Sequence, residues 1–389
     1  MKALTEYRII LADGASYNEK RNVREMLKSF GLFVPVFTDK EPVHAPELVF
    51  GKTNRAASQS LYSTLPCGGY AIVSEDDSIY VAYDNYLVAT EAIARIGELF
   101  RSDEELPLNI LEIPDHSALH MQKENDEQIR VMTTNIVAAG DVSALKYLAE
   151  KYDVTYVDRI DLQASVILDY LPDFIGLQEL QEGTVNKING LMHTEIAKYI
   201  SDEYTLVNLD EFVPVKKHQW TPIAYRHTKW ELLEFRAARN EEILNVMHRW
   251  QWGVYRNKEN GQLFIHMNLH GPHSGNEQFR DFQPIFFGRV NEQVKALLEK
   301  YPNTPMAITG DYNQLYDTPS MQELKKNTTL DTAYLVAKDT TYPEHYGIID
   351  HIMINTDVQT ADTYRMIEDG LIYMTSDHRP CFVDLTVKK

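Results

Sequence analysis

Hydrophobic residues in the first part of the chain gather in short runs, and polar residues separate these runs at regular intervals. Runs of strand length alternate with stretches whose apolar residues recur at helical spacing. The predicted strands are 7–13, 48–50, 69–74 and 78–83, and the predicted helices are 18–30, 56–65 and 86–100. The acidic turn 75–77 between two of these strands predicts a β-hairpin. Together these elements predict a small α/β domain over residues 1–112.

A change of pattern at residues 113–128 marks a boundary. This stretch combines Pro114 with the polar run 123–127, and such a composition is typical of a linker. Strands and helices alternate again from Ile129 onward, so we predict a second domain over residues 129–389. Its predicted strands begin at 129 and continue at 174–179, 222–226, 263–269, 306–309, 349–354 and 381–387.

Composition adds a broad class to this picture. The chain has 389 residues, of which 44% are hydrophobic and 24% charged, as in an ordinary globular protein with room for two domains. No apolar run approaches the roughly 18 residues that a membrane span needs. The start of the chain turns acidic at Glu6 before a signal-type apolar stretch forms, and only Cys67 and Cys381 are present. These features predict a cytoplasmic protein, or a secreted one if a leader has been removed.

The charge balance bears on the class of substrate. A formal charge of −19, from 57 acids against 38 bases, repels polyanions and offers no electrostatic footprint for duplex nucleic acid. The largest basic cluster is 216–218, which a solvated loop explains. Acids that bind a metal are themselves part of the negative count. The charge therefore disfavours a nuclease without excluding one.

Polar residues follow several predicted strands of the second domain. Glu179 ends one apolar run, and Asp311 and Asn313 follow another after Gly310, which permits a tight turn. An acid and an amide side by side can polarise a water and hold a phosphate oxygen, and a buried carboxylate is costly unless it is paired or binds a metal. Plainer explanations exist for each: an exposed acid at a strand end for Glu179, and an Asx-type turn for the other two.

Histidines and their neighbours add candidates for proton transfer. Asp377 and His378 are adjacent and face differently, so one can approach a metal while the other takes a proton from water. A catalytic imidazole needs a partner that fixes its tautomer and raises its basicity, and Asp350 is the obvious candidate. The commoner fate of a histidine is a lone position on the surface, which is the alternative for His378.

A histidine also ends the predicted strand 263–269. A zinc site built from His266, His270 and His273 fails on geometry, because strand residues four apart lie roughly 13 Å from each other. We therefore interpret His270 as a phosphate-oxygen donor or general acid, with a plain strand-end histidine as the alternative. The set as a whole contains carboxylates, amides and imidazoles, which suits a hard divalent cation and phosphate ester hydrolysis.

Taken in their order along the chain, these signatures resemble the endonuclease/exonuclease/phosphatase superfamily. That group includes pancreatic DNase, apurinic endonucleases, neutral sphingomyelinases and inositol-polyphosphate 5-phosphatases. The resemblance covers about residues 129–387. The motifs that carry it are Thr134-Asn135, Gln178-Glu179, His270, Gly310-Asp311-Tyr312-Asn313, Ile349-Asp350-His351 and Ser376-Asp377-His378. It implies an α+β fold, a DNase-like four-layer α/β/β/α sandwich, here preceded by the smaller α/β domain.

The resemblance also implies roles for individual residues. Glu179 is the principal Mg²⁺ ligand, with support from Asn135 and Asp377, and Mn²⁺ is a possible substitute. The remaining implied catalytic residues act on water, phosphate or proton: Asp311 orients the water, Asn313 holds the phosphate, His270 contacts the scissile phosphate, and His378, oriented by Asp350, transfers a proton or donates to the transition state.

Further positions match the family outside this set. Arg159 and Gln163 resemble its helix before the second strand, and the Tyr225-Arg226 pair resembles its central strand, which often faces the substrate. Arg226 and Arg379 are candidates to neutralise a substrate phosphate. The chain departs from the pattern in two places: Thr134 stands where an aromatic residue often precedes the asparagine, and His351 follows Asp350 where an aromatic residue is common.

The sequence therefore predicts an Mg²⁺-dependent phosphoric ester hydrolase that cleaves a small or lipid-type phosphate ester by direct attack of water. One alternative is a metal-dependent endonuclease or exonuclease. Another is an interaction module in which catalysis is secondary or absent, and the complete metal set argues against it. The sequence leaves open the substrate, the number of metals, the general base, the role of the first domain and the oligomeric state.

Overall fold

A computed structural model describes most of the chain. It covers residues 3–113 apart from 16, 67–68, 85 and 103–106; residues 123 and 125–137; 156–181; 196–207 apart from 198; 219–238; 249–273; 277–341; 348–367; and 376–388. The chain forms two compact units, Met1–Gln122 and a second unit built from Lys123–Glu368 and Ile372–Lys389. Within the described residues, no helix has the length and apolarity needed to cross a membrane.

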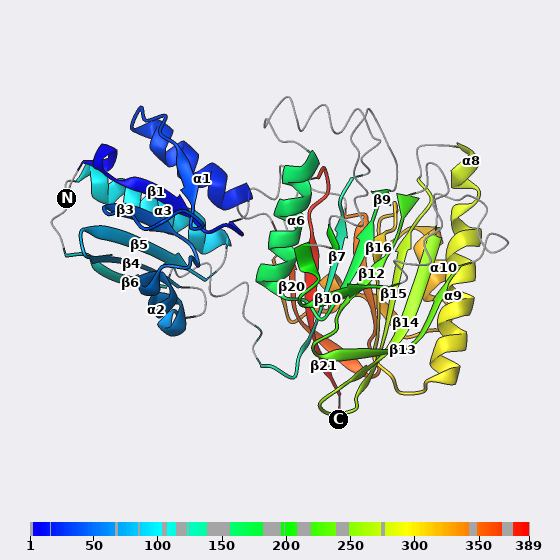
Figure 1. Cartoon of the computed structure of the whole chain (residues 1–389). Helices are drawn as coiled ribbons and strands as arrows, with labels where there is room; N and C mark the ends of the chain where they lie inside the picture. The colour runs from blue at the N-terminus through cyan, green and yellow to red at the C-terminus, as the bar shows by residue number, and fades with distance from the viewer. Residues whose placement is uncertain are drawn as a thin grey trace. The chain divides into compact units, whose positions relative to one another are not determined.

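The first unit is a six-stranded mixed sheet with helices (Figure 1). Its sheet order is β2-β1-β3-β5-β4-β6, and the predicted hairpin is confirmed, because β4 and β5 pair from Glu75 opposite Ser78. Both turn residues, Asp76 and Asp77, have positive φ, as a two-residue hairpin turn of this hand requires. Its elements are η1 Leu4–Glu6, β1 Arg8–Leu11, α1 Tyr17–Ser29, β2 Val36–Thr38, β3 Glu47–Phe50, α2 Ala56–Thr64, β4 Tyr70–Glu75, β5 Ser78–Tyr83, α3 Tyr86–Arg101 and β6 Asn109–Glu112.

The second unit is built on two sheets. One has the order β10-β12-β8-β7-β21-β20-β18 and the other the order β13-β14-β15-β16-β19-β17, with a short β11-β9 pair beside them. Its strands are β7 Ile129–Asn135, β8 Phe174–Gln178, β9 Leu180–Gln181, β10 Tyr204–Leu206, β11 Gln219–Trp220, β12 Ile223–Arg226, β13 Trp230–Ala237, β14 Arg249–Asn257, β15 Leu263–His270, β16 Met306–Asp311, β17 Leu330–Thr332, β18 Asp339–Thr341, β19 Asp350–Asn355, β20 Gln359–Met366 and β21 Cys381–Val387.

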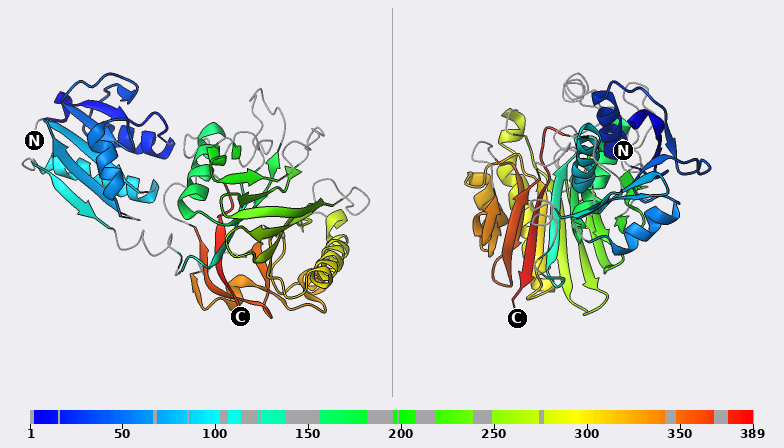
Figure 2. Two further views of the ribbon diagram at one scale, coloured as in Figure 1. Left: turned by 60° about the horizontal axis from the view of Figure 1, so that its bottom comes forward. Right: turned by 90° about the vertical axis from the view of Figure 1, so that its left-hand side faces the viewer.

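Helices cover the outer faces of the two sheets. The helices of the second unit are α6 Tyr156–Tyr170, α8 Glu277–Arg280, α9 Gln283–Lys300, α10 Pro319–Lys325 and α11 Ala333–Val336. In Figures 1 and 2, α6 lies on one side of the paired sheets and α9 on the other. The ring of Tyr170 on α6 packs against Phe382 of β21, and Phe286 of α9 packs against Trp250 of β14. The predicted four-layer α/β/β/α sandwich is confirmed.

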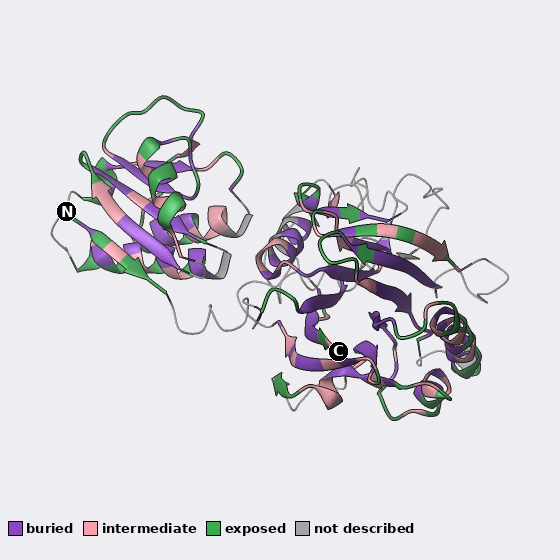
Figure 3. Cartoon of the chain, turned by 90° about the horizontal axis from the view of Figure 1, so that it is seen from below, coloured by how far each residue is buried: buried purple, intermediate pink, exposed green. Residues whose placement is uncertain are grey.

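The alternation of side chains along each strand explains the core between the sheets. In β7, Ile129 and Val131 face the second sheet and join a buried cluster with Phe264 and Ile352 from the opposite side. The neighbouring residue of β7, Arg130, faces α6 and donates to the carbonyl of Tyr170. Figure 3 shows the buried residues concentrated on the strands of both sheets. The inward faces of the strands are therefore mainly apolar away from the ends of the sandwich, and polar side chains gather on β15 and β16 toward one end.

Three long strands, β13, β14 and β20, were not among the predicted elements. Strand β13 has no regular alternation of exposure, and β14 is buried on both faces over most of its length. A strand buried on both faces has no period of two to detect, because both sets of side chains are shielded. Strand β14 is therefore set by its neighbours in the sheet rather than by its own pattern.

Candidate active site

Polar side chains from both sheets meet at one end of the sandwich. Asn135 is the last residue of β7 and Glu179 follows β8, while His270, Asp311 and Asp350 are end residues of β15, β16 and β19. Strand pairing aligns the last three, because His270 lies opposite Asp311 and Asp311 lies opposite Asp350. Asn135, His270, Asp311 and Asp350 lie on the inward faces of their strands. The strand ends of one sheet therefore face the strand ends of the other across the site.

Asp311 is the centre of this group. Its Oδ2 accepts a hydrogen bond from Nδ2 of Asn135 at 3.0 Å, and it lies 3.6 Å from Nε2 of His270 and 3.8 Å from Nε2 of His378. Its Oδ1 accepts the backbone N–H of Asn313 at 2.8 Å. Nearly all of its side chain is buried. Asp311 is thus held from several sides at a point where its charge faces two imidazoles.

Asn135 links the two sheets. Its Nδ2 donates to Oε1 of Glu179 at 3.1 Å as well as to Asp311, and its Oδ1 accepts the backbone N–H of Val137 at 3.0 Å. The amide therefore presents its nitrogen to both carboxylates. Sequence reasoning predicts a metal ligand at this position, and in the structure the amide contacts both acids of the candidate site and holds them at a fixed separation.

His378 and Asp350 form a close pair. Nδ1 of His378 lies 2.7 Å from Oδ2 of Asp350, so the carboxylate accepts from the Nδ1–H and leaves Nε2 directed toward Asp311. Burial by itself lowers the pKa of His378, but the charge and hydrogen bond of Asp350 together with the charges of Asp311 and Asp377 outweigh it and raise that pKa well above its usual range. Burial raises the pKa of Asp350, and His378 opposes this shift. The pair favours an imidazolium at neutral pH.

Two overlapping clusters have the chemistry of a cation site. Glu179, His270 and Asp311 each offer a ligand atom, and these atoms lie within 4.8 Å of one another; the same is true of Asp311, Asp350 and His378. Over the residues that the structure describes, Oδ1 of Asp350 is buried without a hydrogen-bond partner. Carboxylate oxygens are the donors that Mg²⁺ prefers. The residues present therefore fit a hard divalent cation.

The backbone is strained at two positions of the site. Glu179 has φ of 59° and Asn313 has φ of 52°, in the left-handed region that residues with a Cβ adopt at a cost. Asn313 tolerates this conformation better than most residues, and its Nδ2 donates to the carbonyl of Gly271 at 3.1 Å. Glu179 gains no such compensation from its residue type. Strain of this kind is typical of functional positions, where the fold fixes a side chain that local preference would place elsewhere.

The turn before β21 carries three further predicted residues. Oγ of Ser376 donates to the carbonyl of Asn135 at 2.7 Å and accepts the N–H of His378 at 3.0 Å, which fixes His378 relative to β7. Arg379 donates to the carbonyl of Ser376 at 3.1 Å and to that of His378 at 3.3 Å, so it braces this turn. Asp377 is exposed and belongs to neither carboxylate–histidine cluster among the described residues.

Tyr225 and Arg226, which the sequence predicts to contact substrate, are not brought to this site. Strand β12 is antiparallel to β8, and Tyr225 pairs with Phe174 at the start of β8, whereas Glu179 follows its end. The ring of Tyr225 packs against Tyr255, and Nε of Arg226 donates to Glu203 at 3.0 Å. The direction of β12 therefore places both residues at the opposite end of the sandwich.

The two departures from the family pattern have structural explanations. His351 is fully buried between the rings of Tyr312 and Tyr334, and its Nε2 lies 2.8 Å from the carbonyl of Gln314. Burial lowers its pKa to about 4, so a neutral ring occupies an aromatic position. Thr134 faces α6, where its Oγ1 lies 3.3 Å from Oε1 of Gln163.

Helix α6 also supports the loop after β7. Nη2 of Arg159 donates to the carbonyls of Ile136, at 2.5 Å, and Val137, at 3.1 Å. These carbonyls directly follow Asn135. The two α6 residues singled out by sequence therefore brace the end of β7 and do not themselves reach the carboxylates in the contacts described.

Comparison with known proteins identifies the fold. No family model matches the sequence. No curated protein matches it either. Solved structures do match: an endonuclease/exonuclease/phosphatase from Bacteroides vulgatus is 18% identical with a TM-score of 0.53, and the match covers 67% of this chain and 99% of that one.

Two further structures cover the same share. The Bacteroides thetaiotaomicron mannosyl-6-phosphatase is 18% identical over 66% of this chain and 99% of its own, with a TM-score of 0.53. The catalytic domain of human Nocturnin with a bound sulfate is 16% identical over 67% of this chain and 95% of its own, with a TM-score of 0.52. The chain therefore contains the endonuclease/exonuclease/phosphatase fold. A shared fold at this identity does not assign an activity.

Proposed function

We propose that the chain is a divalent-metal-dependent phosphoesterase that hydrolyses a small or lipid-type phosphate ester by direct attack of water. The observation that carries this proposal is the convergence of Glu179, Asp311 and Asp350 with two histidines at one end of the sandwich, with ligand atoms within 4.8 Å in each cluster. Asp311 is buried and Glu179 and Asp350 are partly buried. Carboxylates at such separations repel one another, and a bound cation removes that cost.

In this proposal the metal is Mg²⁺, held chiefly by Glu179. When bound, it supplies positive charge that stabilises the developing negative charge on the phosphate. Asn135 keeps Glu179 and Asp311 at a fixed separation through its two hydrogen bonds. Asp377 is exposed, so any contribution it makes to the metal comes from the rim of the site.

The remaining residues act on water and phosphate. Asp311 orients the attacking water, because its Oδ2 is the shared neighbour of both imidazoles. Asn313 and His270 hold the phosphate oxygens. His378, kept charged by Asp350, donates from Nε2 to the oxygen on which charge develops. No covalent intermediate is needed, because the water is the nucleophile.

Charge supports a compact substrate over a polynucleotide. The formal charge of −19 opposes a long polyanion, whereas one phosphate group needs only the local groups of the site. The similar Bacteroides thetaiotaomicron structure is named as a mannosyl-6-phosphatase, which agrees with a small phosphate monoester. We therefore infer higher catalytic efficiency on sugar, inositol or lipid phosphates than on DNA or RNA.

A substrate panel tests this proposal. Sugar phosphates, inositol phosphates, sphingomyelin, single-stranded RNA and plasmid DNA are each incubated with the enzyme in Mg²⁺ and in EDTA, at moderate salt. We expect Mg²⁺-dependent release from at least one small or lipid substrate. Efficient cleavage of DNA with no small substrate turned over reverses the choice in favour of a nuclease. Full activity in EDTA contradicts metal dependence.

A further inference from the structure

A layer of buried polar side chains lies directly beneath the site. Asn268 is two residues before His270 on β15, Thr309 is two residues before Asp311 on β16, and Gln178 precedes Glu179 at the end of β8. Because side chains two apart on a strand share a face, Asn268 and Thr309 point into the same space between the sheets as the residues above them. All three are fully buried.

Asn268 makes five hydrogen bonds, and four of them cross to residues in or next to β8 and β12 of the other sheet. Its Oδ1 accepts from Nε2 of Gln178 at 2.7 Å and from Oγ1 of Thr309 at 3.0 Å. Its Nδ2 donates to the backbone carbonyls of Leu177, Thr221 and Pro222, at 2.8, 3.1 and 3.0 Å. Two of these partners, Gln178 and Leu177, immediately precede Glu179. One side chain of the second sheet therefore fixes the end of β8 in the first.

The space around this network is closed. A Cβ added at Gly176 would lie 1.9 Å from Oγ1 of Thr309 and 2.3 Å from Oδ1 of Asn268. On the other side, Nε2 of His266 lies 2.9 Å from Oγ1 of Thr309, and burial lowers the pKa of His266 to about 3. A neutral imidazole can donate to the hydroxyl, which then donates to Asn268. Glycine at 176 lets the sheets approach closely enough for these contacts.

We infer that Asn268 is a positioning residue that sets the separation of Glu179 and Asp311 by joining β8 to β15 and β16. This inference rests on the proposed function, in which those two carboxylates hold the metal and the water. A buried amide that loses its partners is costly, so the network has one favourable arrangement and resists sliding of one sheet over the other.

The opposite end of the sandwich supplies a matched control. Asn355 at the end of β19 is also buried, its Oδ1 accepts from Nε2 of Gln359 and from the N–H of Met306, both at 2.7 Å, and its Nδ2 donates to the carbonyl of Thr304 at 3.0 Å. It thus joins β19 and β16 to β20 of the other sheet. A change at Asn355 disturbs an equivalent inter-sheet bridge far from the carboxylates.

The experiment compares Asn268→Leu with Asn355→Leu. Binding of Mn²⁺ is titrated by electron paramagnetic resonance without substrate, and unfolding by urea is measured for the same samples. We expect both variants to lose stability, and only Asn268→Leu to raise the Kd for Mn²⁺, by about 10- to 100-fold, as outer-shell changes typically do. Equal Kd values for the two variants and the wild type overturn the positioning role.

Milder changes at Thr309 guard against loss of folding in Asn268→Leu. Thr309→Val removes the hydroxyl at nearly constant volume, whereas Thr309→Ser keeps it. We expect the Kd for Mn²⁺ to be higher in the valine variant than in the serine variant. We also expect the valine variant to lower kcat more than it raises KM. The same Kd in both variants contradicts the network.

The outcomes separate this inference from the proposed function. If the wild type binds Mn²⁺ and the Asn268 and Thr309 variants bind it equally well, only the positioning role is wrong. If the wild type binds no Mn²⁺ at millimolar concentration, the metal-dependent function and the positioning role both fall.

Discussion

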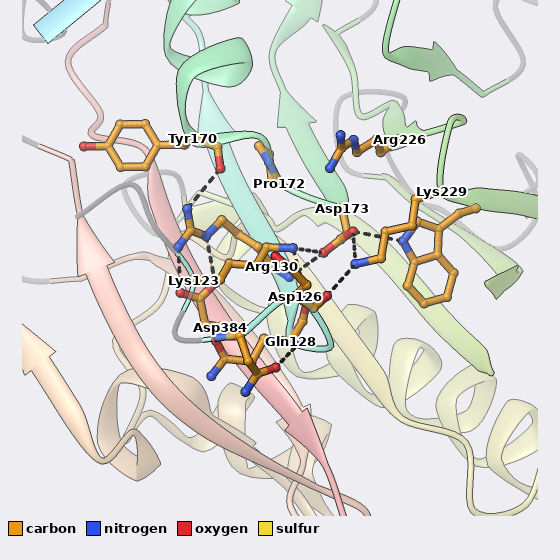
Figure 4. A network of polar contacts seen from close by, with 12 residues as sticks. Lys123, Asp126, Gln128, Arg130, Tyr170, Pro172, Asp173, Arg226, Lys229 and Asp384 are labelled. Atoms are coloured by element: carbon orange, nitrogen blue, oxygen red, sulfur yellow. Dashed lines mark hydrogen bonds and ion pairs between the residues drawn. The ribbon is translucent and has the colours of Figure 1, made fainter. Parts of the chain in front are cut away.

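Buried acidic side chains have different kinds of partners at the two ends of the second unit. At the end away from the site, Asp173 is fully buried, and its carboxylate lies 2.7 Å from Nζ of Lys123 and 3.0 Å from Nζ of Lys229. Arg130 and Asp384 form a bidentate pair there with both contacts at 2.7 Å. Figure 4 shows these residues in one network. Asp173 and Asp384 thus each have a permanent cation from the chain itself.

At the site end, neither Asp311 nor Asp350 has a lysine or arginine partner in the contacts that the structure describes. Asp311 and Asp350 contact imidazoles, the amide of Asn135 and a backbone N–H, and the cation nearest to them is the charged form of His378. A buried charge with only partial compensation is costly. In the proposed function, the far end is complete in itself and serves stability, while a bound cation and substrate complete the site end.

Glu179→Gln gives the largest expected effect. It keeps size but removes the charge that holds a hard cation, so we expect kcat/KM to fall roughly 10⁴-fold, equivalent to about 5.5 kcal/mol of transition-state stabilisation. Added Mg²⁺ should restore little. The control is Glu203→Gln at the far end, which removes an acid paired with Arg226 and should leave kcat/KM near the wild-type value. Near-normal turnover in Glu179→Gln contradicts the metal assignment.

Asp350→Asn tests the pair with His378. The amide cannot orient the imidazole as the carboxylate does, so kcat should fall about 10³-fold with little change in KM. The charge of Asp350 raises the pKa of His378, and its loss lowers that pKa. If protonated His378 is the donor, activity is lost as pH rises through its pKa, so the alkaline limb of the pH–rate profile should move to lower pH. An unchanged kcat with a raised KM would make Asp350 a binding residue.

Asp384→Asn removes the charged partner of Arg130 at the end of the sandwich away from the site. It leaves the buried Arg130 guanidinium facing a neutral amide, which should cost about 3 kcal/mol in the free energy of unfolding. Urea unfolding followed by circular dichroism measures this loss. Because the site lies at the other end, kcat/KM per folded molecule should change less than about twofold. A large loss of activity at full folding would show that the two ends are coupled.

We expect the loss of folding stability at acid pH to arise at the far end of the sandwich. Burial raises the pKa of Asp173, but Lys123 and Lys229 outweigh it and hold that pKa below its usual range. A carboxyl group whose pKa is lowered by folding stabilises the protein above its unfolded pKa, about 3.9, and this contribution is lost as pH falls through the folded value. We expect stability to drop below about pH 4, less steeply in Asp173→Asn. Equal slopes in urea titrations at pH 3 to 5 would contradict this.

Arg226→Met gives the smallest expected effect. Arg226 lies beside Glu203 at the far end, and a partly exposed ion pair of this kind is worth about 0.5 kcal/mol. We expect kcat/KM on the best substrate of the panel to stay within about twofold of the wild type. A tenfold rise in KM would indicate that Arg226 contacts the substrate. It would then contradict the placement of Arg226 at the far end, which follows from the direction of β12.

Turns and the residues in them could be predicted where their conformation depends on neighbours in the sequence. The turn from Asp311 to Asn313 follows from aspartate and asparagine after an apolar run, and Asp311 is the last residue of β16, although Gly310 stays in the strand and does not form the predicted turn. The hairpin around Asp76 is local in the same sense. The roles of Glu179, Asp311 and His378 in catalysis stay predictions until activity is measured.

Sequence by itself determined which chemical groups stand at strand ends, because a strand has a period of two and a turn has a characteristic composition. Only the tertiary structure decided which ends meet. The antiparallel course of β12 places Arg226 away from the site, and the register of β15 with β16 sets His270 opposite Asp311. The bridge from Asn268 to Gln178 was likewise hidden, because it joins residues 90 positions apart across two sheets and leaves no periodic trace in the chain.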